Sequence, residues 1–142
     1  MGITLLIPQK LNLSRRNIRA FVKEVLNLLG IKKASLSIAL VDRDEIKRIN
    51  REFRGVDRET DVISFFGYDE NYLGDIVVSY EVVRENAQLY GEDPDVELRR
   101  VIVHGILHLL DYRDYEEEER NRMFEKQEEI LRLLDGYKLG FK

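Results

Sequence analysis

The feature that most constrains this chain is the position of its two histidines within one apolar run. The run spans residues 101–110, and every residue in it other than His104, Gly105 and His108 is a valine, isoleucine or leucine. This pattern predicts a helix that is apolar all round and therefore buried. Helix positions four apart lie on one face, about one turn from each other. The two imidazoles must therefore find partners inside the protein, either through hydrogen bonds or by binding one transition metal.

The histidine helix carries half of a known metal-binding pattern. In zincin peptidases the motif H-E-x-x-H supplies two zinc ligands and a glutamate that acts as general base. Gly105 occupies the glutamate position here, which argues against a metallopeptidase. A glycine inside a helix lowers helix stability by about 1 kcal/mol relative to alanine. We expect Gly105 to serve either helix packing or the close approach of another backbone or a ligand.

A third metal ligand must come from a carboxylate. A catalytic zinc usually takes three protein ligands, and the chain has no cysteine and no third histidine. The nearest candidates are Asp111, Asp114 and the acidic run 116–119, although that run is better explained as the first turn of the last helix. In a continued helix, Asp114 would point away from the histidines. We therefore expect the chain to turn back after Leu110, since aspartate tolerates turn and left-handed conformations.

The hydrophobic periodicity along the chain predicts an α+β fold. Short stretches rich in strand formers alternate with stretches at helical spacing that begin at capping residues. The expected strands cover residues 3–7, 36–41, 61–66 and 74–79, and the expected helices follow Ser14, Asp42, Ser79 and Asp93 or cover residues 116–134. We expect a single small domain, residues 1–142, with a mixed sheet of about four strands, about five helices and a zincin-like histidine helix.

Composition limits the compartment and the partners. The absence of cysteine fits a reducing cytoplasm. The N-terminus lacks the basic region of a signal peptide, and no apolar stretch is long enough to span a bilayer. A net charge of −4 argues against a general nucleic-acid-binding surface but allows a local basic patch. We expect a cytoplasmic protein with neither a membrane nor a DNA partner.

A line of basic residues runs along one side of the second expected helix. Lys47, Arg51, Arg54 and Arg58 are spaced so that they lie on one side of a helix and form a cationic stripe. The apolar stripe of the same helix, Ile46, Ile49 and Phe53, lies on the opposite side. Gly55 can end the helix before Arg58 joins the stripe. Acidic neighbours favour an ordinary solvated face for Lys47 and Arg51.

Three segments resemble the YbeY family of bacterial rRNA maturation factors. The run His104-Gly-x-Leu-His108-Leu-x-x-Tyr112 is similar to the family signature H-G-x-L-H-L-x-G-Y-D-H. Phe53-Arg54-Gly55 together with residues 60–65 resembles the family's arginine-containing central segment, and residues 73–76 resemble its G-D-I strand. Order, spacing and length agree, so the resemblance covers nearly the whole chain.

This resemblance implies a small α+β domain that acts as a zinc-dependent, single-strand-specific endoribonuclease. The family matures the 3′ end of small-subunit ribosomal RNA and takes part in ribosome quality control. The implied metal ligands are His104, His108 and Asp114, with Asp114 in place of the family's third histidine. The resemblance marks Arg54 as functional, and its guanidinium suits phosphate binding and charge stabilisation during cleavage. Proton transfer then falls to the metal-bound water or to Asp75 of the G-D-I strand.

Two further positions of the signature differ, because Asp111 replaces a glycine and Arg113 replaces an aspartate. One zinc per chain is expected, although the carboxylate of Asp114 also accepts other divalent transition metals. The expected partners are single-stranded ribosomal RNA and the small ribosomal subunit or its assembly proteins. The alternative is a non-catalytic ribosome-assembly factor that uses the metal only to fix its fold.

Overall fold

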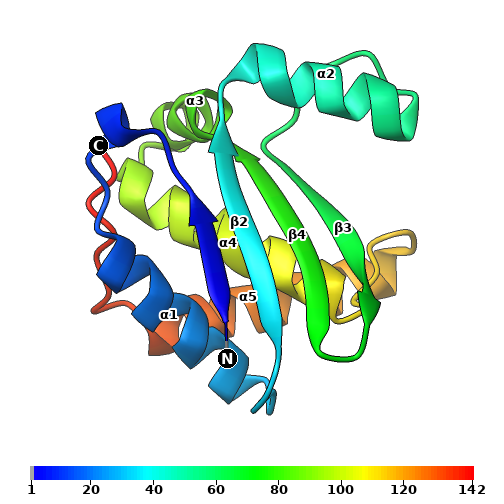
Figure 1. The fold of residues 1–142 in the computed structure, drawn as a ribbon. Coiled ribbons are helices and arrows are strands. Elements are labelled where there is room, and N and C mark those ends of the chain that lie inside the picture. Colours follow the sequence, from blue (N-terminus) through cyan, green and yellow to red (C-terminus); the bar gives the residue numbers. More distant parts are fainter. Residues whose placement is uncertain (1) are drawn as a thin grey trace.

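The computed structural model, which describes residues 2–142, confirms an α+β architecture with one mixed sheet (Figure 1). The element types follow the hydrophobic periodicity of the sequence. Along the chain the structure contains β1 (Ile3–Leu6), the short 3-10 helix η1 (Gln9–Leu11), α1 (Arg15–Leu28), β2 (Ser35–Val41), α2 (Arg43–Arg54), β3 (Val62–Asp69), β4 (Tyr72–Ser79), α3 (Tyr80–Tyr90), α4 (Pro94–Leu109) and α5 (Glu117–Leu133).

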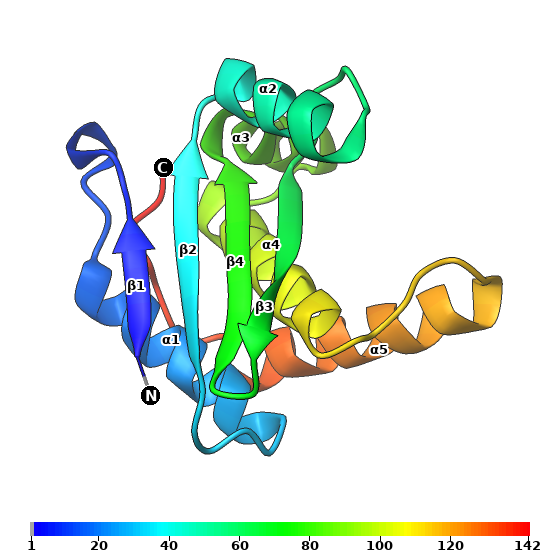
Figure 2. The same cartoon turned by 45° about the vertical axis from the view of Figure 1, so that its right-hand side comes forward.

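The sheet has the strand order β1-β2-β4-β3. Strand β2 runs parallel to both β1 and β4, whereas β3 runs antiparallel to β4. A tight connection between Asp69 and Tyr72 joins β3 to β4, and the strand order places β3 at one edge of the sheet. The histidine helix α4 packs behind β3 and β4 (Figure 2), so the β3 edge of the sheet lies beside the histidines.

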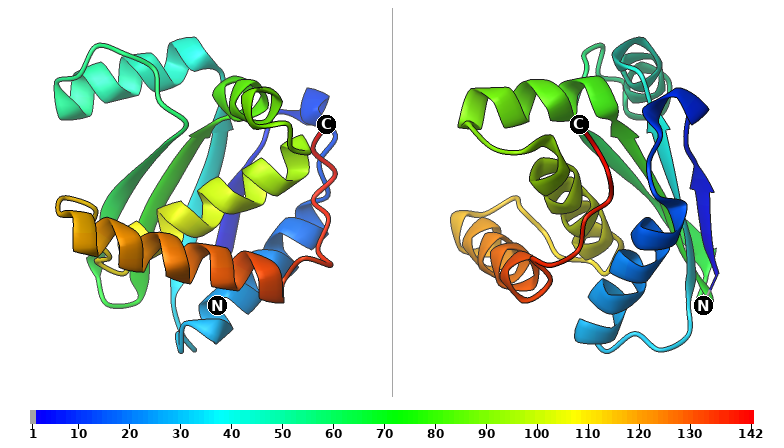
Figure 3. Two further views of the ribbon diagram at one scale, coloured as in Figure 1. Left: turned by 180° about the vertical axis from the view of Figure 1, so that it is seen from behind. Right: turned by 90° about the vertical axis from the view of Figure 1, so that its left-hand side faces the viewer.

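Helices α1, α4 and α5 cover one face of the sheet in two layers. Helices α1 and α4 lie against this face, and α5 lies outside α4 (Figure 3). The prediction of a buried histidine helix is confirmed, since the side chains of Ile102, Ile106 and Leu107 are almost completely buried. No helix in residues 2–142 is both long enough and apolar enough to cross a membrane.

The opposite face of the sheet is covered only at one end, where α2 packs (Figure 3). Ile46 of α2 is fully buried there, as expected. Phe53 was expected in the same apolar stripe, but this prediction is wrong because 67% of its surface is exposed. Its ring contacts the edge strand instead, with the ring of Phe65 at a centroid distance of 5.7 Å. The last turn of α2 therefore extends beyond the apolar part of the sheet.

The expected capping residues begin their helices. The side chains of Ser14, Asp42 and Ser79 each accept a hydrogen bond from a backbone amide in the first turn. Asp93 does the same for α4, with Pro94 at the first helical position. These caps satisfy amides that lack a partner within the helix, and the cap at Asp93 sets the start of the histidine helix.

Candidate metal centre

The two histidines of α4 face each other at one surface of the helix. Their ring centroids lie 4.7 Å apart, and the Nε2 atoms of His104 and His108 are separated by 3.1 Å. Both side chains are half-buried, whereas the helix residues around them are mostly buried. The spacing of four residues thus brings two ring nitrogens close together at the edge of the buried core, as the sequence predicts.

A backbone reversal after α4 brings Asp114 back to the histidines. Asp111 adopts a left-handed conformation with φ +68°. Its amide donates to the carbonyl of His108, and the amide of Tyr112 donates to the carbonyl of Leu107, both at 3.0 Å. These two bonds form a Schellman motif, in which the left-handed position is usually glycine. The predicted turn after Leu110 is therefore confirmed.

This reversal completes a cluster of three side chains. The carboxylate Oδ2 of Asp114 lies 3.7 Å from Nε2 of His108. One potential ligand atom from each of His104, His108 and Asp114 lies within 4.8 Å of the other two. Across residues 2–142, no second group of histidine and carboxylate side chains comes together in this way. The run 116–119 instead forms the N-cap and acidic first turn of α5.

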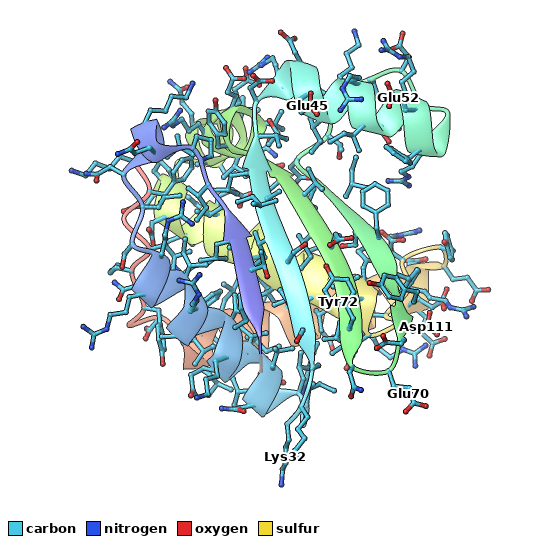
Figure 4. The ribbon with its side chains drawn as sticks, in the orientation of Figure 1. Lys32, Glu45, Glu52, Glu70, Tyr72 and Asp111 are labelled. Atoms are coloured by element: carbon cyan, nitrogen blue, oxygen red, sulfur yellow. The ribbon has the colours of Figure 1, made fainter. Side chains whose placement is uncertain are left out.

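A cleft of about 630 Å³ opens over this cluster. The β3 edge, the end of α2 and the loop between α4 and α5 line it. The lining residues are Arg54, Thr60, Asp61, Val62, Ile63, Ser64, Phe66, His104, His108, Asp111, Tyr112, Arg113, Asp114 and Tyr115. The loop lies beside the β3 edge, where Figure 4 labels Asp111. The cleft combines two imidazoles, carboxylates and a guanidinium, which can hold a cation and an anionic ligand together.

The surroundings favour the neutral, metal-binding form of His108 and orient the ring of His104. Burial lowers the pKa of His108 below its ordinary value, and the charges of His104 and Arg54 act in the same direction, while Asp114 opposes them. The other ring nitrogen of His104, Nδ1, lies 2.9 Å from Oε1 of Gln127 on α5. A hydrogen bond at this remote nitrogen is typical of metal-ligating histidines.

The donor set fits a divalent transition metal. Two imidazoles and one carboxylate match the ligand types that zinc takes in catalytic sites. Two ligand atoms at tetrahedral positions 2.0–2.1 Å from zinc are about 3.3 Å apart, close to the 3.1 Å between the two Nε2 atoms. The side chain of Asp114 is 42% exposed, so the third donor can adjust its position easily.

The structure also places the remaining predicted residues. Arg54 ends α2 and lines the cleft; of the predicted basic stripe it alone does so among the described residues. Arg51 instead lies 3.6 Å from Asp57. Asp75 is not brought to the cleft, because side chains alternate along β4 and Ile76 is the one that faces Gly105 of α4.

Asp75 belongs to a separate polar group on the open face of the sheet. Its carboxylate accepts hydrogen bonds from the hydroxyls of Ser37 and Tyr72. Figure 4 labels Tyr72 on this face of the sheet. Burial and the bond to Asp75 raise the pKa of the Tyr72 phenol. Asp75 therefore has a structural environment of its own and does not contact the candidate metal centre.

Sequence reasoning missed Gln127. The residue is 6% exposed and lies on the face of α5 that also buries Met123 and Ile130. A polar residue at positions i+4 and i−3 from two core residues is a recognisable signal, because a buried amide needs a polar partner. His104 is that partner.

Comparison with known proteins places this arrangement in a family. Residues 7–135 match the family model described as Endoribonuclease YbeY. A protein of Shouchella clausii named Endoribonuclease YbeY is 40% identical to this chain, and the match covers 84% of this chain and 85% of that protein. A protein of the same name from Sulfurihydrogenibium is 36% identical, and the match covers 84% of this chain and 82% of that protein. The solution structure of TM1509 from Thermotoga maritima superposes with a TM-score of 0.71 at 35% identity, covering 94% of this chain and 89% of that one. Family model, relatives and fold agree, and the chain belongs to the YbeY endoribonuclease family.

Proposed function

We propose that this protein is a metal-dependent endoribonuclease that cuts single-stranded RNA, with residues 1–142 acting as one domain. The observation that carries the proposal is the convergence of His104, His108 and Asp114 in a cleft that also contains Arg54. Family membership supports the hydrolytic reaction and the RNA substrate.

The proposed ligands of the metal are the Nε2 atoms of His104 and His108 and the carboxylate of Asp114. Zinc is the proposed ion, and the carboxylate makes other divalent transition metals acceptable as well. When bound, such an ion supplies Lewis acidity and a water of lowered pKa. The lowered pKa of His108 keeps its lone pair available near neutral pH.

Arg54 is the proposed phosphate-binding residue. It lies in the last turn of α2 and lines the cleft. Arg54 lines the same cleft as His104, His108 and Asp114, so its guanidinium can bind a phosphate held in that cleft. A guanidinium can donate two hydrogen bonds to the phosphate oxygens and stabilise the charge that develops during cleavage.

The proposed biological substrate is ribosomal RNA. We propose that the protein matures the 3′ end of small-subunit rRNA in the cytoplasm, takes part in ribosome quality control and meets the small subunit or its assembly proteins there. The net charge of −4 supports a local site over an extended nucleic-acid-binding surface. Recognition of rRNA would then depend on the cleft and on these partners.

The test is a cleavage assay with quantified metal. Purified protein is incubated with single-stranded rRNA fragments and with the same sequences as duplexes, alongside His108→Ala and the matched control Arg58→Ala, which changes a basic residue outside the cleft. We expect cutting of single strands by wild type and Arg58→Ala, and none by His108→Ala. Cleavage that survives in His108→Ala would indicate a contaminating nuclease. RNA binding without any cleavage would favour the assembly-factor alternative.

A further inference from the structure

Gln127 is a buried amide in contact with a proposed metal ligand, and the orientation of this amide can be deduced. Its side chain lies between the core residues of α5 and faces α4. The amide has two ends, one that donates and one that accepts. The end facing His104 decides which ring nitrogen of that histidine carries the proton.

The neighbouring carboxylate of Glu128 fixes the orientation of the amide. Nε2 of Gln127 donates to Oε2 of Glu128 at 3.2 Å. Both oxygens of this carboxylate accept hydrogen bonds from Arg100, so they face the NH₂ end of the amide and leave its oxygen to face His104. Arg100 holds the carboxylate in place through two hydrogen bonds of 3.1 and 3.3 Å. Arg100 also binds Glu92 and Glu97 and is thus itself anchored.

The oxygen of Gln127 in turn fixes the proton on His104. Because Oε1 can only accept, Nδ1 of His104 must donate across the 2.9 Å contact. In a neutral imidazole the other nitrogen is then unprotonated. That nitrogen is Nε2, which lies 3.1 Å from Nε2 of His108 and faces the shared ligand position.

We propose that Gln127 is a positioning residue that holds His104 in the Nδ1–H tautomer, so that Nε2 presents its lone pair to the metal. Hydrogen bonds connect Arg100 to Glu128, Glu128 to Gln127 and Gln127 to His104. This series of bonds links the charged residues between α4 and α5 to the histidine in the cleft. The proposal about metal rests on the proposed function, whereas the tautomer is a property of the protein itself. An amide also leaves the centre without a second negative charge beside Asp114.

Two variants of Gln127 separate positioning from general packing. Gln127→Leu keeps the approximate volume and loses the acceptor, whereas Gln127→Glu keeps an acceptor at the same place. Nitrogen-15 NMR of the imidazoles in metal-free protein reports the tautomer of His104, and competition with a chromogenic chelator reports zinc affinity. Thermal unfolding of each variant shows whether it is folded.

We expect wild type and Gln127→Glu to hold His104 in the Nδ1–H form. Gln127→Leu should lose this preference and bind zinc about 10- to 100-fold more weakly, the usual effect of removing such a hydrogen bond. Protonated Nε2 in the wild type, or an unchanged tautomer in folded Gln127→Leu, would overturn the proposal. If the wild type shows the expected tautomer but binds no zinc, the proposed metal function fails while the assignment of the tautomer to Gln127 stands.

Discussion

Substitution of Gly105 by alanine tests how closely α4 must approach the sheet. A Cβ at Gly105 would lie 2.8 Å from Cγ2 of Ile76 and 3.3 Å from Oγ of Ser64. Carbon atoms prefer separations of about 3.5–4.0 Å, so the helix and β4 must move apart by about 0.7 Å or more. The β-branched side chain of Ile76 cannot swing away, and β4 is held between β2 and β3.

The net effect of Gly105→Ala follows from two opposing terms. Alanine stabilises a helix interior by about 1 kcal/mol relative to glycine. Overpacking a core lowers stability by about 1–3 kcal/mol. We therefore expect Gly105→Ala to lower the free energy of unfolding by about 1 kcal/mol, within a range of about 0–2. The same substitution in an Ile76→Ala background, which lacks Cγ2, should instead raise stability by about 1 kcal/mol.

The assay is chemical denaturation with a chelator present, because bound metal would add its own stabilisation. Ile76→Val is the matched control, since it shortens the side chain but keeps Cγ2, and Gly105→Ala should remain destabilising in it. If Gly105→Ala changes stability equally in the wild-type and Ile76→Ala backgrounds, the contact with Ile76 is not the reason that position 105 requires glycine.

Three further predictions concern separate parts of the structure. Arg54→Ala should reduce RNA cleavage by about 10-fold or more with unchanged metal content, and wild-type activity in this variant would refute its role in phosphate binding. Burial raises the pKa of Glu97 above its ordinary value of 4.5 despite the contact with Arg100. The stability of wild type relative to Glu97→Gln should therefore be highest below pH 4.5 and fall as pH rises through the raised pKa; a pH-independent difference in denaturation experiments would contradict this. Asp95 is 4% exposed and accepts hydrogen bonds from Arg99 at 3.0 Å and from two backbone amides of the C-terminal tail. Asp95→Ala should therefore lower the free energy of unfolding by about 3–5 kcal/mol, because it leaves the buried guanidinium of Arg99 unpaired. A loss below about 1 kcal/mol would show that this ion pair is not needed for stability.

The helices, the strands and the histidine pair could be predicted because local rules decide them. Capping residues such as Ser14 and Asp42 mark helix starts, and the spacing of His104 and His108 fixes their common face. The turn that recovers Asp114 was also predictable, since Asp111 is a residue that tolerates left-handed backbone. These features depend on a few neighbouring residues only.

Features that depend on contacts between distant elements could not be predicted in the same way. Asp75 was expected near the reaction, but its side of the sheet depends on the register of β4 against β2 and β3. Phe53 fits the apolar spacing of α2, yet the helix extends past the part of the sheet that could bury it. The contact of Gln127 with His104 joins residues 23 positions apart and requires the packing of α5 on α4.

The most direct test of the proposed metal centre is the metal content and zinc affinity of purified Asp114→Ala. Asp111→Gly is the matched control, because it changes the other aspartate of the same loop, removes its charge and places glycine at the left-handed position. We expect one equivalent of zinc in wild type and in Asp111→Gly, and loss of most of it in Asp114→Ala, since Asp114 is the only carboxylate within residues 2–142 that joins the two histidines. A full equivalent of metal bound by Asp114→Ala at unchanged affinity would contradict the proposed ligand set.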